Sequence, residues 1–196
     1  MGKIFCLMGK SSTGKDTIFE LIKDDEKVKL EPIISYTTRP RRNGEQVGQT
    51  YHFINKNELD EYDRKNKVIE QRCYNTVEGP WYYATIDDGQ IDLDNNNYIM
   101  IVTLEAYGKL ISYFNSEDII PLYIYVEDGV RIERALGREK RQQKPNYDEM
   151  CRRYLADQKD FSEEALGKYN IVDYYYNHNL EDCLEEVKQT INKYTN

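Results

Sequence analysis

The sequence predicts an α/β fold with a parallel core sheet. Segments rich in strand-forming residues alternate along the chain with segments of helical spacing, which is the pattern of strand–helix–strand units. The first apolar run, residues 3–8, is short, as expected of a strand buried on both faces. The length of 196 residues suits one compact domain with room for a small inserted lobe.

In the first half of the chain, helical spacing begins soon after the first strand. Apolar residues fall on one side of a helix over residues 17–22. A surface helix over residues 55–67 begins with Asn55 and Glu58, which are spaced as a capping box. Short strands are expected over residues 32–35, 51–54, 68–70 and 81–85.

In the second half, a polar segment interrupts the alternation. Residues 87–97 are mostly Asp, Asn and Gly, which predicts a weak helix or a mobile loop. Asn179 is the expected N-cap of the closing helix. We expect strands over 98–104, 121–126 and 171–176, and helices over 105–114, 129–138, 148–166 and 179–194.

The composition argues against several classes of function. A net charge of −8 creates no field that attracts duplex nucleic acid, so no nucleic-acid partner is expected. No apolar run approaches the ~18 residues of a membrane span, so no membrane partner is expected either. The cysteines form no C-x-x-C pair, which argues against a zinc or redox motif and is typical of a reduced, cytoplasmic protein. They are Cys6, Cys73, Cys151 and Cys183.

The strongest local motif follows the first strand and opens the first helix. Its sequence is Gly9-Lys10-Ser11-Ser12-Thr13-Gly14-Lys15-Asp16-Thr17, the pattern of a phosphate-binding loop. Glycine and small residues let successive main-chain N–H groups face one anion, and the helix N-terminus adds partial positive charge. The lysine supplies a full charge that can reach the transferred phosphate. The alternative is an ordinary turn that happens to contain glycine.

Asp16 departs from the usual motif, which has Ser or Thr after the lysine as a magnesium ligand. Either Asp16 or the next hydroxyl residue, Thr17, can serve as the ligand, and a carboxylate oxygen suits Mg²⁺ well. Without the metal, the carboxylate would repel nucleotide phosphates. Alternatively, Asp16 is simply an acid at a helix start, where negative charge is favoured.

A second concentration of positive charge lies in residues 35–42. This segment, Ser-Tyr-Thr-Thr-Arg-Pro-Arg-Arg, places three arginines around one proline. The planar guanidinium group matches phosphate oxygens two at a time. By itself a basic loop is typical of solvated surface. In a chain that also has a phosphate loop, it indicates a site for a second phosphate.

These motifs together resemble the guanylate kinase family. The matching segments, in the family's order and spacing, are Gly9 to Thr17, Ser35 to Arg42, Gly44-Glu45 with Gly48, Tyr51-His52-Phe53, Val68-Ile69-Glu70 and Tyr82-Tyr83. The resemblance implies a P-loop NTPase-type three-layer fold that transfers the γ-phosphoryl group of ATP to GMP with Mg²⁺. It implies a single domain with its core at residues 1–34, 87–137 and 151–196, a GMP-binding lobe at 35–86 and a lid at 138–150.

The resemblance also assigns the binding residues. For ATP it implies Gly9, Ser11, Ser12, Thr13, Gly14, Lys15, Asp16, Thr17 and Asn177, with Asp16 and Thr17 also at the metal. For GMP it implies Arg39, Arg42, Tyr51 and Tyr83 at the phosphate, and Ser35, Glu70, Thr85 and Glu105 at or near the base.

The chemistry of guanine agrees with this assignment. Guanine presents two neighbouring donors, N1–H and the exocyclic amine, and the carboxylate of Glu70 can accept both, whereas adenine has no such pair. The alternatives are an exposed strand acid for Glu70 and half-buried sheet packing for Tyr51 and Tyr83.

The family carries two acidic residues after the strand expected at 98–104, and this chain departs from that pattern. Thr103 takes the first position and Glu105 the second. A carboxylate that organises the metal or the lysine is therefore missing. We hypothesise that Asp16 compensates, so that Asp16→Ser abolishes magnesium-dependent turnover.

Positive charge is also dense between residues 131 and 153. A solvated helix is one explanation. The resemblance implies instead a mobile lid that closes over ATP, with Arg138 and Arg153 as catalytic residues alongside Lys15. The basic residues are Arg131, Arg134, Arg138, Lys140, Arg141, Lys144, Arg152 and Arg153.

Three alternatives to a GMP kinase stay open. The first is a kinase of the same family for another phosphorylated acceptor, such as ribose bisphosphate or another nucleoside monophosphate. The second is a non-catalytic binding module of the same fold. The third is a P-loop NTPase switch. For the GMP kinase we expect the small-molecule partners ATP and GMP, and a monomer or small homo-oligomer.

Overall fold

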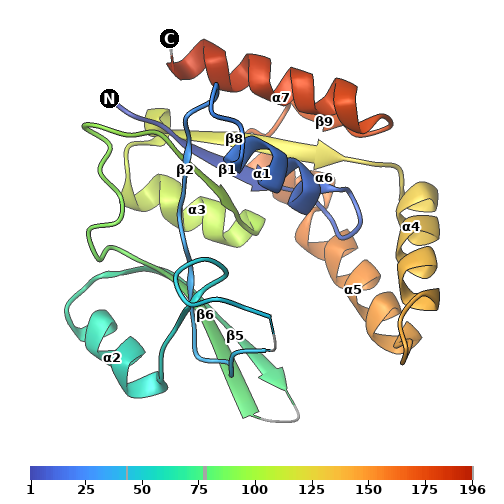
Figure 1. The fold of residues 1–196 in the computed structure, drawn as a ribbon, viewed down its shortest axis with the longest axis horizontal. Coiled ribbons are helices and arrows are strands. Elements are labelled where there is room, and N and C mark those ends of the chain that lie inside the picture. The colour runs from blue at the N-terminus through green and yellow to red at the C-terminus, as the bar shows by residue number, and fades with distance from the viewer. Residues whose placement is uncertain (43, 77–78, 196) are drawn as a thin grey trace.

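The computed structural model describes residues 1–42, 44–76 and 79–195. Its larger sheet has five parallel strands in the order β2-β7-β1-β8-β9, which confirms the predicted core sheet (Figure 1). The strands are β1 (Ile4–Met8), β2 (Glu31–Pro32), β7 (Tyr98–Ile101), β8 (Ile119–Tyr125) and β9 (Tyr174–Tyr176). Strand β1 is central because all of its side chains are apolar and all are buried.

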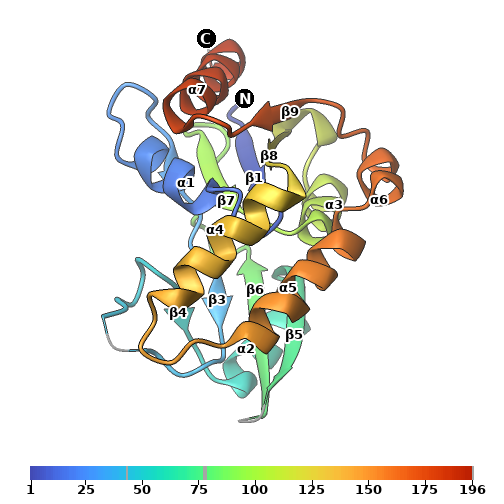
Figure 2. The ribbon, with the colours of Figure 1, turned by 90° about the vertical axis from the view of Figure 1, so that its right-hand side faces the viewer.

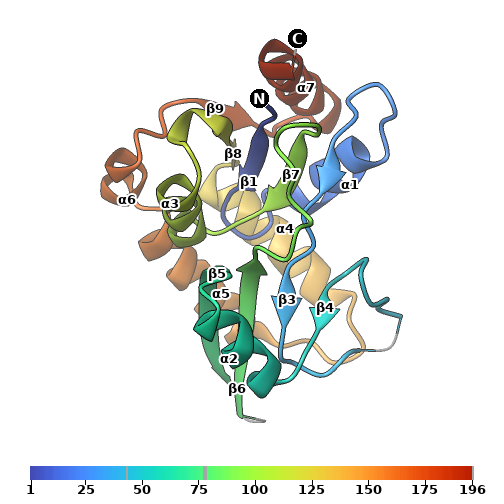
Figure 3. The same ribbon diagram turned by 90° about the vertical axis from the view of Figure 1, so that its left-hand side faces the viewer.

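Helices cover both faces of this sheet and give the predicted three layers. Successive side chains of a strand point to opposite faces. Phe5 and Leu7 therefore pack with α1 and α7, whereas Ile4 and Cys6 belong to the cluster that contains α3 and α6 (Figures 2 and 3). These helices are α1 (Lys15–Lys23), α3 (Leu104–Tyr113), α6 (Glu163–Lys168) and α7 (Leu180–Thr195).

A second sheet, in the order β4-β3-β6-β5, forms a separate lobe below the core in Figure 3. Helix α2 packs on it through Leu59 and begins with the predicted capping box. Asn55 accepts from the main-chain N–H of Glu58 at 3.0 Å, and the Glu58 carboxylate accepts from the N–H of Asn55 at 2.7 Å. The elements are β3 (Tyr36–Thr37), β4 (His52–Phe53), α2 (Lys56–Arg64), β5 (Val68–Thr76) and β6 (Gly79–Ile86).

Two further helices, α4 (Asp128–Lys140) and α5 (Tyr147–Asp160), pack against each other. Figure 2 shows this helix pair in front of the region where the core meets the lobe. The pair also contacts the lobe directly, because Arg72 of β5 forms a 3.3 Å ion pair with Asp160 of α5. The helix pair therefore touches both parts of the molecule.

The expected strand over residues 32–35 is wrong in its bounds. Strand β2 ends at Pro32, and Tyr36 already belongs to the other sheet. The N–H of Ile33 still donates to the Ile99 carbonyl at 3.0 Å, but the N–H of Ile34 donates to the Gln90 side chain at 2.9 Å. The chain therefore leaves the core sheet at Ile34, where the main-chain N–H no longer pairs with a strand, and passes to the lobe.

Capping residues end two other elements earlier than expected. The strand predicted to reach residue 104 stops at Ile101, because Thr103 accepts from the N–H of Ala106 at 3.2 Å and begins α3. The helix predicted over 148–166 is two helices, because Ser162 accepts from the N–H of Ala165 at 3.2 Å and begins α6.

The polar segment over residues 87–97 contains turns and no helix among its described residues. The Asp92 carboxylate accepts from the N–H of Asp94 at 3.1 Å, so the side chain competes for main-chain donors that a helix would use. Strands β5 and β6 extend well beyond the residues expected, because they pair with each other from Val68 to Thr76.

Candidate active site

The phosphate loop joins β1 to α1 at the carboxyl end of the central strand. Gly14 has a left-handed conformation (φ 86°), and a Cβ atom there would lie 2.5 Å from the Asn177 amide nitrogen. At Gly9 a Cβ atom would lie 2.6 Å from the Ile124 carbonyl oxygen. The backbone therefore requires both glycines, as the motif predicts.

The loop presents a row of main-chain N–H groups. Within the described residues, the N–H groups of Ser12, Thr13, Gly14 and Lys15 donate to no acceptor. The buried hydroxyl of Ser12 also has no partner in the described part of the chain. A row of unpaired donors at the start of a helix, in a partly positive field, is a binding site for phosphate oxygens.

Lys15 and Asp16 stand at the open side of this loop. The Lys15 ammonium nitrogen lies 3.5 Å from the Asp16 carboxylate, and the Asp16 side chain is 80% exposed. Burial is the main cause of the raised pKa of Tyr51 in the lobe, and the negative charge of Asp16 contributes to it. Asp16 is therefore close enough to the lobe to act on a residue expected at the GMP phosphate.

The residues beside the loop are chemically suited to Mg²⁺. Among residues 1–42, 44–76 and 79–195, no three His, Cys, Asp or Glu side chains gather into a metal cluster. Mg²⁺ in phosphate sites takes one or two protein carboxylates and fills its other positions with substrate phosphate oxygens and water. Asp16 fits this requirement because it offers an exposed carboxylate at the loop, and Thr17 beside it is also exposed.

In the lobe, Arg39 is buried between two aromatic rings. Its guanidinium carbon lies 5.1 Å from the centre of the Tyr51 ring and 5.4 Å from that of Phe53. Glu45 accepts from both terminal nitrogens of Arg39, at 2.7 Å for one of them, and this pairing is the main reason that the pKa of Arg39 is raised. Arg39 is therefore a permanent positive charge in a fixed position.

Two tyrosines complete the site around Arg39. The rings of Tyr51 and Tyr83 meet edge to face, 5.6 Å apart. Burial raises the pKa of Tyr51, so its hydroxyl stays protonated and can donate to an anion. Arg42 follows on the same loop, and its main-chain N–H donates to Glu45 at 2.8 Å. The structure thus brings together Arg39, Tyr51 and Tyr83, three of the residues predicted to bind the GMP phosphate.

The residues predicted to contact guanine lie on neighbouring strands. The Thr85 hydroxyl of β6 donates to the Glu70 carboxylate of β5 at 2.8 Å. Burial raises the pKa of Glu70, and the nearby charge of Glu105 adds to this effect. Ser35 lies just before β3, where its carbonyl accepts from the N–H of His52 at 2.9 Å. Glu70 and Thr85 are therefore in direct contact, and Glu105 is close to them.

Thr103 has a role that the sequence analysis did not anticipate. It is the N-cap of α3, and Glu105 lies exposed in the first turn of that helix. A threonine side chain satisfies a main-chain donor there much as an aspartate would. The departure at Thr103 therefore preserves the start of the helix, although it removes a charge.

A cavity of about 320 Å³ connects these parts of the molecule. The phosphate loop contributes Ser11 and Ser12 to its wall, and the lobe contributes Arg42. The two arginines predicted to be catalytic, Arg138 of α4 and Arg153 of α5, also line it. The Arg153 side chain donates to Glu149 at 3.0 Å. Arginines from three separate segments border the cavity, so its wall is suited to phosphate groups.

Asn177, predicted to bind ATP, is buried behind the phosphate loop. Its side-chain amide donates to the Thr13 carbonyl at 2.7 Å, and its own carbonyl accepts from Arg134 at 3.1 Å. The residue thus supports the loop from the side of β9. A nucleotide contact of Asn177 stays a prediction.

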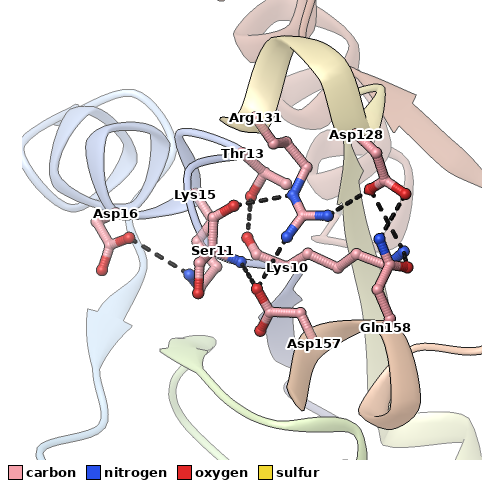
Figure 4. Close-up of polar contacts among 9 residues, drawn as sticks. All are labelled: Lys10, Ser11, Thr13, Lys15, Asp16, Asp128, Arg131, Asp157 and Gln158. Atoms are coloured by element: carbon pink, nitrogen blue, oxygen red, sulfur yellow. Dashed lines mark hydrogen bonds and ion pairs between the residues drawn. The ribbon is translucent and has the colours of Figure 1, made fainter. Parts of the chain in front are cut away.

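Side chains that no sequence motif singles out hold the loop from the other side. Arg131 and Asp157 both bond to Ser11, and Gln158 bonds to Lys10 (Figure 4). Arg131 was counted only as one of many basic residues. The spacing of these residues was the one signal in the sequence that could have found them. Arg131 is seven residues before Arg138, so the two share a face of one helix. Asp157 is four residues after Arg153 and shares a face with it in the same way.

Comparison with known proteins agrees with this geometry. The family model described as guanylate kinase matches residues 1–194. The chain belongs to the guanylate kinase family. It is 28% identical to a guanylate kinase of Mycoplasma mobile, over 98% of this chain and 93% of that protein. It is 24% identical to one of Mesomycoplasma hyopneumoniae, over 98% and 95% of the two chains.

A solved structure supports the same fold. The guanylate kinase of Anaplasma phagocytophilum superposes with a TM-score of 0.64 and 17% sequence identity, covering 98% of this chain and 85% of that one. Membership in the guanylate kinase family makes the protein an enzyme of the nucleotide kinase class. No helix in the described part of the chain is both long and apolar enough to cross a membrane.

Proposed function

We propose that the protein transfers the γ-phosphoryl group of ATP to the phosphate of GMP. One observation carries the proposal: two anion sites border the same cavity. The phosphate loop contributes Ser11 and Ser12 to the cavity wall, and the unpaired N–H groups follow them in the loop. The lobe contributes Arg42, which follows the buried Arg39 on the same loop. A phosphoryl donor and a phosphorylated acceptor bound in these sites would face each other.

The reaction then requires no covalent intermediate. The loop and Lys15 hold the ATP phosphates, and Arg39, Arg42 and the two tyrosines hold the acceptor so that its oxygen attacks in line. Arg138 and Arg153 line the cavity and would balance the charge of the phosphoryl group as it moves. Arg138 lies in the last turn of α4 and Arg153 in the middle of α5, on either side of the connection between the two helices. This placement supports a lid over residues 138–150 that excludes water when it closes.

Mg²⁺ belongs to the same proposal. Asp16, with Thr17 as a second oxygen donor, would hold the ion at the loop. When bound, the ion would neutralise the β- and γ-phosphate oxygens and orient them for transfer. The exposed Asp16 carboxylate has no other cation in contact than Lys15 within the described chain.

Selection of guanine rests on Glu70 and Thr85. The ionised Glu70 carboxylate can accept from N1–H and from the exocyclic amine of guanine, while the Thr85 hydroxyl orients it. A base without these two donors would leave the half-buried carboxylate with only its bond from Thr85, which is unfavourable. This pairing supports GMP over adenine or pyrimidine nucleotides and over acceptors that carry no base.

A coupled assay of ADP release tests the proposal. We expect turnover with GMP and dGMP and far less with AMP, UMP or ribose bisphosphate. Lys15→Ala should lower turnover with every acceptor by about 100-fold or more, as for the loss of one oxyanion donor. Glu70→Ala should mainly weaken discrimination between bases. ATP binding without turnover of any acceptor would indicate a binding module and contradict the proposal.

A further inference from the structure

The cluster that joins the phosphate loop to the α4–α5 helix pair is the feature least explained by substrate binding. Arg131 is the largest fully buried side chain in the described core, with 2% of its side chain exposed. Its guanidinium carbon lies 5.4 Å from the centre of the Tyr154 ring. A guanidinium so deeply buried needs partners for its N–H groups, and the structure provides them from three segments.

The first set of partners forms a closed ring around Ser11 (Figure 4). Arg131 donates its Nε–H to the Ser11 carbonyl at 2.9 Å and a terminal N–H to Asp157 at 2.9 Å. The same Asp157 oxygen accepts from the main-chain N–H of Ser11 at 2.7 Å. Both main-chain polar groups of one loop residue are therefore held by a single ion pair.

A second set of contacts holds the neighbouring loop residue. Lys10 donates to the Gln158 side-chain oxygen at 2.6 Å, and the Gln158 amide donates to Asp128. Asp128 also accepts from Arg131 at 2.5 Å and lies 3.7 Å from the Lys10 ammonium group. Consecutive loop residues thus meet consecutive residues of α5. Two cations balance two carboxylates, so the cluster is not itself an attractive site for phosphate.

Helix geometry connects this cluster to the cavity. Arg138 is seven residues beyond Arg131, about two turns or ~10 Å along α4 on the same face. Arg153 is four residues before Asp157, about one turn or ~6 Å along α5 on the same face. Both arginines line the cavity together with Ser11. The ion pair therefore fixes the place from which each helix extends its arginine toward the loop.

We propose that Arg131 and Asp157 are positioning residues that join the phosphate loop to the α4–α5 pair and thereby align Arg138 and Arg153 with the bound phosphates. This role rests on the proposed phosphoryl transfer. A buried ion pair is not needed for stability as such, because a pair of apolar side chains can replace it with little loss. A misplacement of about 1 Å in a catalytic group can lower a rate by about 100-fold.

The test uses the full-length protein with ATP and GMP. Asp157→Ala removes one of the two carboxylates that pair with Arg131 and leaves Asp128 as the other. The double variant Arg131→Leu with Asp157→Ala removes both charges of the ion pair and replaces the guanidinium with an apolar side chain. Asp160→Asn is the matched control, since Asp160 also pairs with an arginine but lies one turn further along α5 and contacts the lobe. Urea unfolding establishes that the variants are folded. Hydrogen exchange at the Ser11 main-chain amide measures whether the bonds among Ser11, Arg131 and Asp157 are intact, and it needs no nucleotide substrate.

We expect both Asp157 variants to lower kcat by about tenfold or more, with the KM for GMP within about twofold of wild type. The Ser11 amide should exchange faster in both. The control should change neither constant by more than about twofold. A folded double variant with wild-type kcat overturns the proposal. An increase in kcat in either Asp157 variant also overturns it, because Asp157 would then compete with phosphate for the loop. Absence of GMP turnover in the wild type would contradict the proposed function instead, while the Ser11 exchange would still report the ring.

Discussion

Glu45 meets the guanidinium of Arg39 with both carboxylate oxygens, and only 4% of the Arg39 side chain is exposed. Glu45 also accepts from the main-chain N–H of Arg42 at 2.8 Å. One carboxylate therefore holds the guanidinium of Arg39 and the main chain at Arg42, two residues that we propose for the GMP phosphate. The structure thus gives a physical purpose to the glutamate of the Gly44-Glu45 pair.

We predict that Glu45→Gln weakens GMP binding. The Gln side chain has only one acceptor oxygen, so it cannot pair with both terminal nitrogens of Arg39. The main-chain N–H of Arg42 also loses a charged acceptor. The dissociation constant for GMP should rise on the order of tenfold, the size expected for one charge-assisted contact, while ATP affinity stays the same. Calorimetric titration with each nucleotide measures both.

Asp60→Asn is a suitable control for this experiment. Lys56 and Asp60 form an exposed i,i+4 ion pair on α2 of the same lobe. Such pairs contribute little, about 0.3–0.5 kcal/mol, so the control should bind GMP normally. Equal effects of the two substitutions would show that the lobe responds to any loss of negative charge, contrary to a specific role of Glu45.

The ion pair between Glu45 and Arg39 predicts that the stability of the protein depends on pH. The hydrogen bonds from Arg39, and then that from Arg42, lower the pKa of Glu45 from 4.5 to about 2. A carboxyl group whose pKa is lower in the folded state stabilises the protein above the pKa of the unfolded state. That stabilisation is lost as the pH falls from 4.5 toward 2. The gap between the urea midpoints of wild type and Glu45→Gln should be constant above about pH 5.5 and shrink below pH 4.5. A gap that does not change with pH would contradict this origin.

Glu70 predicts that GMP binding depends on pH, because its pKa is raised whereas that of Glu45 is lowered. Burial raises the pKa of Glu70 above its usual 4.5, so the carboxyl group becomes protonated at a higher pH than an exposed glutamate does. Only the ionised form accepts both guanine donors, so GMP affinity should fall as the pH is lowered through this raised pKa. Glu70→Gln should bind GMP more weakly at neutral pH and lack this component. Comparing the two proteins across pH with GMP cancels the titration of the nucleotide phosphate, and parallel profiles would exclude Glu70 as the base contact.

Asp16 can be tested through its dependence on magnesium. If Asp16 supplies the carboxylate that is absent at Thr103, Asp16→Ser should abolish magnesium-dependent turnover, because Ser offers only a weak neutral ligand. Activity should be measured across a magnesium titration at fixed ATP and GMP. Unchanged activity and an unchanged magnesium requirement would show that the exposed carboxylate is no more than a favourable charge at a helix start.

Thr103 should matter for stability rather than charge. Thr103→Ala removes the N-cap of α3 and should lower the free energy of unfolding by about 1 kcal/mol. Thr103→Asp should keep the cap, since aspartate caps helices at least as well as threonine. Urea unfolding of the two variants measures this directly. Equal loss of stability in both would mean that packing, and not the cap, is what the residue contributes.

Local chemistry was enough to predict much of this protein. The capping box at Asn55 and the loop between Gly9 and Lys15 each depend on residues within one turn or one loop, so their patterns are complete in the sequence. The parallel sheet was predictable for a related reason. A strand such as residues 4–8, apolar on both faces, is stable only between two layers of helices.

Tertiary structure decided what depends on distant partners. The turn at Ile34 was set by a bond to the side chain of Gln90. The early ends of the elements at Ile101 and Asp160 are local by contrast, because Thr103 and Ser162 each cap a helix by accepting from the N–H three residues later. The pairing of Arg131 with Asp157 joins residues on two helices to a loop 120 residues earlier in the chain than Arg131. A charged residue in a sequence has no visible partner, and only the folded backbone determines whether it meets water, substrate or an opposite charge.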